Sequence, residues 1–148
     1  MKWSLNLIVI YLGWLLVAIL SLIVIYFDIK IRVIKNYHCS LIALACCVLF
    51  INFHALPQII LPLTILGAGV IFNFKGWFGG GDTKLFAAYS TAILPENLFI
   101  TVLLILIIGG VVSLCCLIKN KWTKSADRGV PYGVAIVIGS LFGIWMSL

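Results

Sequence analysis

Long stretches of this chain contain no charged side chain, and they limit its fold more than any other feature. The 24 residues from Ser4 to Phe27 are uncharged, and no Asp, Glu, Lys or Arg lies between Lys35 and Lys75. A helix crosses the hydrocarbon core of a bilayer with about 20 predominantly apolar residues. Only 9% of the 148 residues are charged, whereas a soluble domain has about 25%. Because so few polar side chains could not cover a soluble protein, the sequence predicts an all-α integral membrane protein.

Breaks in the apolar pattern divide the chain into six expected transmembrane helices. Polar residues and a proline interrupt it at 52–57, a glycine-rich loop covers 75–81, a turn covers 95–97, and a basic loop covers 119–128. We expect one transmembrane domain over residues 1–148, without a cleavable signal peptide, because the first apolar run is about twice as long as a signal h-region. The expected helices are approximately 4–27, 38–53, 57–74, 82–94, 98–118 and 131–148.

The basic residues indicate how these helices are oriented. Nine of the ten lie in or beside the first, third and fifth connecting loops, and the tenth is Lys2. Because cytoplasmic loops carry an excess of Lys and Arg, we expect these three loops in the cytoplasm and both termini outside it. The net charge of +6 then reflects orientation, and no nucleic-acid partner is expected. The five cysteines lack a C-x-x-C pair and lie in or beside apolar segments, so we expect small hydrophobic side chains and no metal site.

Two of the four acidic residues are expected at membrane depth, whereas Glu96 and Asp127 fall in solvated loops. Asp28 ends the first apolar run. Asp82 opens a helix with only about 12 residues before Pro95, too short to cross the core unless its start lies below the interface. An ionised carboxylate at the centre of a membrane helix costs about 2.5–3.5 kcal/mol, so such residues are usually functional.

The expected topology places Asp28 and Asp82 on the same cytoplasmic leaflet, although 54 positions separate them. Two carboxyl groups in contact cannot both ionise, so one holds a proton while the other is a base. Such a pair can draw a proton from water and protonate a carbonyl oxygen. The alternative is that each aspartate caps a helix or pairs with a lysine, which suits Asp82 at a helix start better than Asp28 at a helix end.

Glycines at positions 76, 79, 80 and 81 precede Asp82. The segment GGGDTK lacks the spacing of a nucleotide-binding P-loop, and an acid at the helix start would repel an anion. Glycine permits close approaches that other residues forbid. We therefore expect a turn that lets an extended peptide lie beside Asp82.

Three segments together resemble the type IV prepilin peptidases. The first is FGGGDTKLFAA, from Phe78 to Ala88, which is similar to the G-x-G-D motif of that family. Gly79, Gly81 and Asp82 occupy its fixed positions, and Lys84 stands where the family often has lysine. Lys84 would hold Asp82 ionised or contact substrate, and the alternative is a lysine that extends to the membrane surface.

The other two segments flank this motif in the expected order, so that the three span most of the chain. DIKIRVIKN, from Asp28 to Asn36, resembles the first aspartate motif, an Asp followed by basic residues and an Ile-x-Asn ending. A proline is common where this chain has Lys35, so the loop is less constrained here. VPYGVAI, from Val130 to Ile136, resembles a C-terminal element of the small members of the family.

The resemblance implies a GxGD-type prepilin leader peptidase in the cytoplasmic or inner membrane. Asp28 and Asp82 would be the catalytic pair at the cytoplasmic face. They would cut between the basic leader and the hydrophobic helix of a type IV, Flp-like prepilin or pseudopilin. The implied partners are this precursor and the lipid bilayer, a homo-oligomer is compatible with the sequence, and no cofactor is implied. The positions expected to bind substrate or shape the site are Gly79, Gly81, Lys84, Pro131, Tyr132 and Gly133.

Other functions remain open at this point. The short first loop without C-x-x-C is similar to the peptidase-only type that serves Flp/tight-adherence pili, and an archaeal preflagellin peptidase would look much the same. From other classes, a small proton-coupled transporter could use the two aspartates as a relay, or the chain could be a non-catalytic scaffold. Presenilin-like enzymes share G-x-G-D but have a Tyr before the first Asp, where this chain has Phe27.

Overall fold

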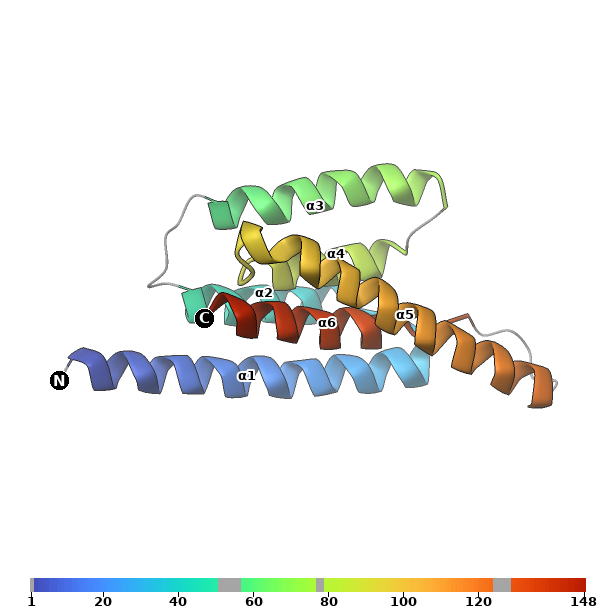
Figure 1. The fold of residues 1–148 in the computed structure, drawn as a ribbon, viewed down its shortest axis with the longest axis horizontal. Coiled ribbons are helices and arrows are strands. Elements are labelled where there is room, and N and C mark those ends of the chain that lie inside the picture. Colours follow the sequence, from blue (N-terminus) through green and yellow to red (C-terminus); the bar gives the residue numbers. More distant parts are fainter. Residues whose placement is uncertain (1, 51–56, 77–78, 124–128) are drawn as a thin grey trace.

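A computed structural model describes residues 2–50, 57–76, 79–123 and 129–148. Within these ranges the chain forms six α-helices and no strand, which confirms the all-α class (Figure 1). The helices are α1 (Lys2–Ile31), α2 (Asn36–Phe50), α3 (Pro57–Phe74), α4 (Gly80–Ser90), α5 (Pro95–Thr123) and α6 (Tyr132–Ser147).

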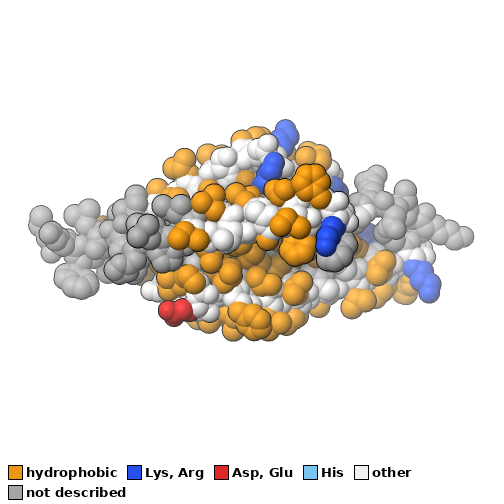
Figure 2. All heavy atoms as spheres, turned by 90° about the horizontal axis from the view of Figure 1, so that it is seen from above, with side chains coloured by type: hydrophobic (Ala, Val, Ile, Leu, Met, Phe, Trp, Pro, Cys, Tyr) orange, Lys and Arg blue, Asp and Glu red, His pale blue; other side chains and the backbone are white. Residues whose placement is uncertain are grey.

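Successive helices run in opposite directions along the long axis of the molecule (Figure 1). The last residues of α1, α3 and α5 and the first residues of α2, α4 and α6 therefore lie at one end. We call it the basic end, because most of the described Lys and Arg residues lie in or beside these helix ends. Figure 2 shows a mainly hydrophobic face with Lys and Arg side chains toward that end. These residues are Lys30, Arg32, Lys35, Lys75, Lys84, Lys119 and Lys121.

Two helices have the length and hydropathy of a membrane span over most of their length. The apolar segments are Ile10–Ile31, with 22 residues, and Pro95–Lys119, with 25. Shorter apolar helices lie at Asn36–Leu49, Ile60–Phe74 and Tyr132–Ser147. Many large hydrophobic side chains, such as Leu22 and Leu106, are exposed on the outside of the bundle. Lipid is the solvent that suits such a surface.

The core of the bundle is a ring of four helices. α1 packs against α2, α2 against α4, α4 against α6, and α6 against α1. The buried hydrophobic cluster comes from these helices and from the turn after α4, with Val24, Ile42, Leu85 and Val137 as central members. α3 packs on the outside of α4, and α5 on the outside of α6. The short helix α4 is therefore surrounded on three sides.

Glycines let α5 and α6 approach each other closely. A Cβ atom on Gly139 would lie 2.5 Å from the Ile105 side chain and 3.1 Å from its backbone nitrogen. One turn further along α6, Gly143 faces Thr101 in the same way. This small-xxx-small spacing is typical of tightly packed membrane helices, whose association depends on van der Waals contact.

A buried hydrogen bond joins α1 to α4 across the ring. Val17, Ser21, Val24 and Asp28 are all buried, and their spacing of four, three and four residues places them on one face of α1. The Ser21 hydroxyl donates its only proton to the Val17 carbonyl oxygen, at 2.7 Å, and can therefore only accept a further hydrogen bond. The Tyr89 hydroxyl of α4 therefore donates to Ser21 Oγ, at 2.6 Å.

Several helix ends differ from the sequence-based expectation. α1 continues through Asp28 to Ile31 and stops where Arg32 adopts a left-handed φ of 59°. α4 covers 80–90 rather than 82–94, because the backbone then forms tight turns in which Ala92 and Ile93 bond to carbonyls three residues back. α5 begins at Pro95 and not at 98, since a proline loses no hydrogen bond in the first turn. The expected end of the second helix, at 53, lies outside the described residues.

We expect Tyr89→Phe to lower the free energy of unfolding by about 1 kcal/mol, the usual contribution of one buried hydrogen bond. Ser21 keeps its bond to Val17 in this variant, so no buried donor is left without a partner. Tyr11→Phe is the matched control, because Tyr11 is 70% exposed. Thermal or denaturant unfolding in detergent measures both variants, and equal stability of the two would contradict a structural role for the Tyr89 bond.

Candidate active site

Asp28 lies in the interior at the basic end of the bundle. Its exposed fraction is only 5%, because it is the next member of the buried face of α1 after Val24. The start of α6 at Gly133 lies directly against its carboxyl group, and the backbone N–H groups of the first turn of α6 face it. Among the described residues, its Oδ2 atom has no hydrogen-bond partner. Asp28 therefore keeps one oxygen unpaired beside a helix start that favours negative charge.

Gly133 is the residue that lets α6 approach Asp28. A Cβ atom at this position would lie 2.6 Å from Oδ2 of Asp28 and 2.8 Å from its Cγ. Any larger residue would displace the carboxyl group or the start of α6. Gly133 was predicted to shape the site, and the structure places it in direct contact with Asp28.

Asp82 lies in the first turn of α4, where the glycines before it bring the chain close to its neighbours. Gly79 is the residue before the helix, and a Cβ atom there would lie 3.0 Å from Oδ2 of Asp82. A Cβ atom on Gly81 would lie 3.4 Å from the side chain of Ile34, in the segment between α1 and α2. The glycines thus bring the start of α4 against the segment that follows Asp28.

The two aspartates face one cavity of about 340 Å³. Asp28 comes from α1 and Asp82 from α4. Of the other predicted site residues, Gly79, Gly81 and Tyr132 also line this cavity. The structure therefore brings together two motifs that are far apart in the sequence. The remaining lining residues are Arg32, Val33, Ile34 and Val130.

Arg32 was not among the predicted site residues, yet it lines the cavity and connects its two sides. Its Nη1 donates to the carbonyl oxygen of Gly129 at 2.6 Å, which ties the end of α1 to the segment before α6. Its charge acts on Asp28, one turn earlier in the chain. A positive φ is uncommon for a residue other than glycine and is often found at functional sites. That backbone conformation has no signature in the sequence.

Lys84 lies next to the cavity rather than in it. Its Nζ donates to Oδ1 of Asn36 at 3.0 Å, at the start of α2. Asn36 ends the segment that begins with Asp28, so this bond joins the two aspartate motifs from the outside. Two roles for Lys84 were open from the sequence, a contact with Asp82 or substrate and an extension to the membrane surface, and Asn36 was not predicted as its partner.

Pro131 and Tyr132 shape the start of α6. Pro131 is the residue before the helix and is buried. The ring of Tyr132 lies against Gly109 of α5, where a Cβ atom would approach it to 2.9 Å. Ser113, one turn along α5, donates to the Tyr132 hydroxyl at 3.5 Å. These contacts hold the α6 start that faces Asp28. Among the described residues, no three His, Cys, Asp or Glu side chains form a group that could hold a metal ion.

One comparison with known proteins identifies a family for this chain. The model of the type IV leader peptidase family matches residues 14–114, more than half of the chain, and this range contains both aspartates. No curated protein and no solved structure matches the chain. Together with its long apolar helices, the match identifies a membrane protein of the peptidase class. The chain belongs to the type IV leader peptidase family.

Proposed function

We propose that this protein is a membrane-embedded aspartic endopeptidase that removes the basic leader of a type IV prepilin or pseudopilin. Asp28 and Asp82 form its catalytic pair. The observation that carries the proposal is that both carboxyl groups line one cavity although their motifs are 54 positions apart. The family match supports a leader peptidase in general terms.

The reaction uses one carboxylate and one carboxylic acid. The carboxylate takes a proton from water as the oxygen attacks the carbonyl carbon of the scissile peptide bond. The carboxylic acid gives its proton to the carbonyl oxygen, which produces a tetrahedral diol. As the diol collapses, one of its hydroxyl groups returns a proton to the ionised aspartate, the C–N bond breaks, and the leaving nitrogen takes up the proton held by the other aspartate. The start of α6, which lies against the Asp28 carboxyl group at Gly133, limits the movement of this group during these steps.

We further propose that all six helices lie in the membrane, with the basic end in the cytoplasm and both termini on the other side. The positive-inside rule supports this orientation, because Lys and Arg residues are concentrated at the end that contains the cavity. A cytoplasmic cavity suits a substrate whose leader is basic and cytoplasmic. The short segment between α1 and α2 favours the peptidase-only type that processes Flp-like pilins.

Asp28→Asn and Asp82→Asn are each expected to lower the rate of leader cleavage by about 10²- to 10⁴-fold, the usual contribution of a general acid or base. Each change keeps the shape of the side chain and removes its titratable group. The assay is cleavage of a co-expressed Flp-type prepilin, read as a mobility shift. Glu96→Gln is the matched control, because Glu96 is exposed in the first turn of α5 and does not line the cavity. Normal cleavage by either Asn variant would rule out the pair.

The rate of cleavage should pass through a maximum as pH changes. At low pH both carboxyl groups are protonated and no base remains, and at high pH both are ionised and no acid remains. Initial rates with purified enzyme in detergent, from acid to alkaline pH, give the profile. A flat profile from an enzyme that stays folded at every pH would count against the shared proton.

Gly133→Ala is expected to reduce cleavage by about 10²-fold, because a displacement of a catalytic group by about 1 Å has effects of this size. The added methyl group would occupy the space of the Asp28 carboxyl. Gly110→Ala is the control, since a Cβ atom at this helical position meets nothing within 4 Å. Both variants should insert and remain folded. A Gly133→Ala enzyme as active as the control would show that the contact does not position Asp28.

A further inference from the structure

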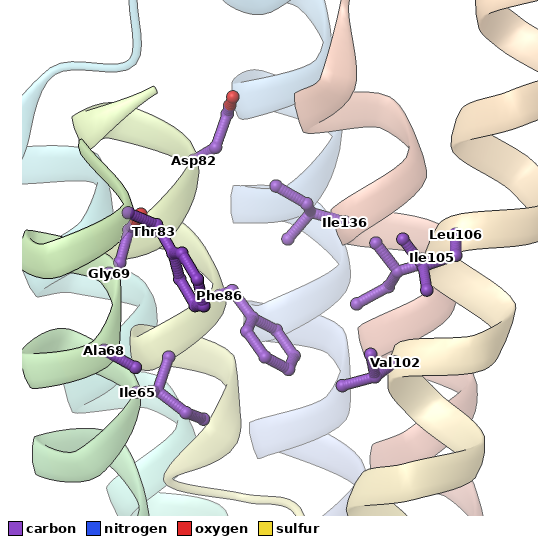
Figure 3. Close-up of a pocket in the computed structure, with 11 residues that line it drawn as sticks. Ile65, Ala68, Gly69, Asp82, Thr83, Phe86, Val102, Ile105, Leu106 and Ile136 are labelled. Atoms are coloured by element: carbon purple, nitrogen blue, oxygen red, sulfur yellow. The ribbon is translucent and has the colours of Figure 1, made fainter. Parts of the chain in front are cut away.

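A second cavity, of about 370 Å³, lies between α3 and α5 (Figure 3). We call it the α3–α5 groove. Ala68 of α3 and Leu106 of α5 stand on its two walls, and Phe86 of α4 and Ile136 of α6 lie between them. Asp82 lies at one end of the groove. Among the described residues, it is the only charged residue that lines the groove.

The groove follows from the way the helices pack. α3 rests on α4, and α5 rests on α6, and these two outer helices share no extended packing with each other in the described ranges. The space between them is therefore closed below by α4 and α6 and is not filled from the sides. Small side chains help to keep this space open, because Ala68 and Gly69 lie on the side of α3 that faces the groove.

The lining suits an apolar helical segment. On α3, Ile65 and Phe72 both line the groove, and seven residues of helix span about 10 Å. On α4, Asp82 and Phe86 are one turn apart on the same face. The groove therefore runs along the helix direction for about two turns, away from Asp82. An amphipathic or apolar helix binds such a groove through side chains spaced three and four residues apart.

The position of Asp82 points to the occupant. Its side chain lines both the α3–α5 groove and the cavity that it shares with Asp28. If a bound polypeptide placed an apolar helix in the groove, the residues at one end of that helix would lie next to Asp82. We propose that the α3–α5 groove binds the first turns of the hydrophobic helix that follows the scissile bond of the substrate. The inference rests on the proposed function, and it assigns the route by which the substrate reaches the aspartates.

The first test compares two substrates. One is the full-length prepilin, and the other is a short peptide that contains the leader and only a few residues after the scissile bond. Ala68→Trp should fill the groove, and it should lower cleavage of the full-length prepilin at least about tenfold more than cleavage of the short peptide. Leu63→Trp is the matched control, because Leu63 is 60% exposed on α3 and lies outside the groove. This variant should cleave both substrates at the wild-type rate.

The outcomes separate the two proposals. If the wild type cleaves the prepilin, and Ala68→Trp cleaves it as fast as Leu63→Trp does, the groove is not the docking site, while the peptidase function stands. An equal loss on both substrates would also overturn the groove, because the effect would then lie in the catalytic steps. If the wild type cleaves neither substrate, the proposed function and the inference fail together.

A second measurement does not depend on how the Trp variant folds. A photoreactive benzophenone amino acid replaces Leu106 in the Asp82→Asn variant, which should hold uncut prepilin. We expect a crosslink to the hydrophobic segment of the prepilin, and none from the same group at Leu22, which is 68% exposed on α1. A crosslink from position 106 to lipid alone would show that an acyl chain fills the groove, and it would overturn the proposal.

Discussion

The hydrogen bond between Tyr89 and Ser21 sets the register of α1 against α4, and with it the level at which Asp28 and Asp82 line their shared cavity. Asp28 lies seven residues after Ser21 on α1, and Asp82 lies seven residues before Tyr89 on α4. Because α1 and α4 run in opposite directions, two turns along each helix lead from the hydrogen bond to the same end of the bundle. A shift of one helix by a single turn, about 5 Å, would break the bond and move the carboxyl groups apart. Hydroxyl groups buried in an apolar core need a partner, so this register is strongly preferred over its neighbours.

Each of the two carboxyl groups lies at the start of a helix. Asp28 meets the first N–H groups of α6, and Asp82 lies in the first turn of its own helix. The first N–H groups of a helix have no partner within it and favour negative charge, so each helix start provides donors without placing a cation in the core. The approach requires glycine at 133, where the methyl group of an alanine would collide with the carboxyl group itself. Glycines 79 and 81 similarly allow the start of α4 to lie beside Ile34 and its own aspartate.

Much of this arrangement could be predicted from the sequence, because it depends on charge and hydropathy. The apolar runs predicted helices close to those observed, and the shortness of the helix after Asp82 followed from Pro95. Asp28 and Asp82 were identified because acids are rare in this chain. Contacts that depend on three-dimensional packing were not accessible. The bond from Lys84 to Asn36 joins residues that are 48 positions apart. Likewise, the left-handed backbone of Arg32 and its bond to Gly129 leave no periodic pattern in the sequence. The ring of four helices also could not be predicted from hydropathy, since the outer helices α3 and α5 are apolar like α1, α2 and α6 in the ring.

The two cavities that share Asp82 differ in polarity, and this difference bears on where a substrate would be cut. The cavity of Asp28 and Asp82 has polar walls that include Arg32 and backbone groups at the basic end. The α3–α5 groove is apolar apart from Asp82 and Thr83. A prepilin of the proposed kind changes from polar to apolar at the end of its leader. If the apolar helix of this prepilin lies in the groove and its leader extends toward the basic end, the change from polar to apolar residues falls at Asp82. Selection of the scissile bond would then depend less on recognition of one side chain than on the depth at which the hydrophobic helix comes to rest.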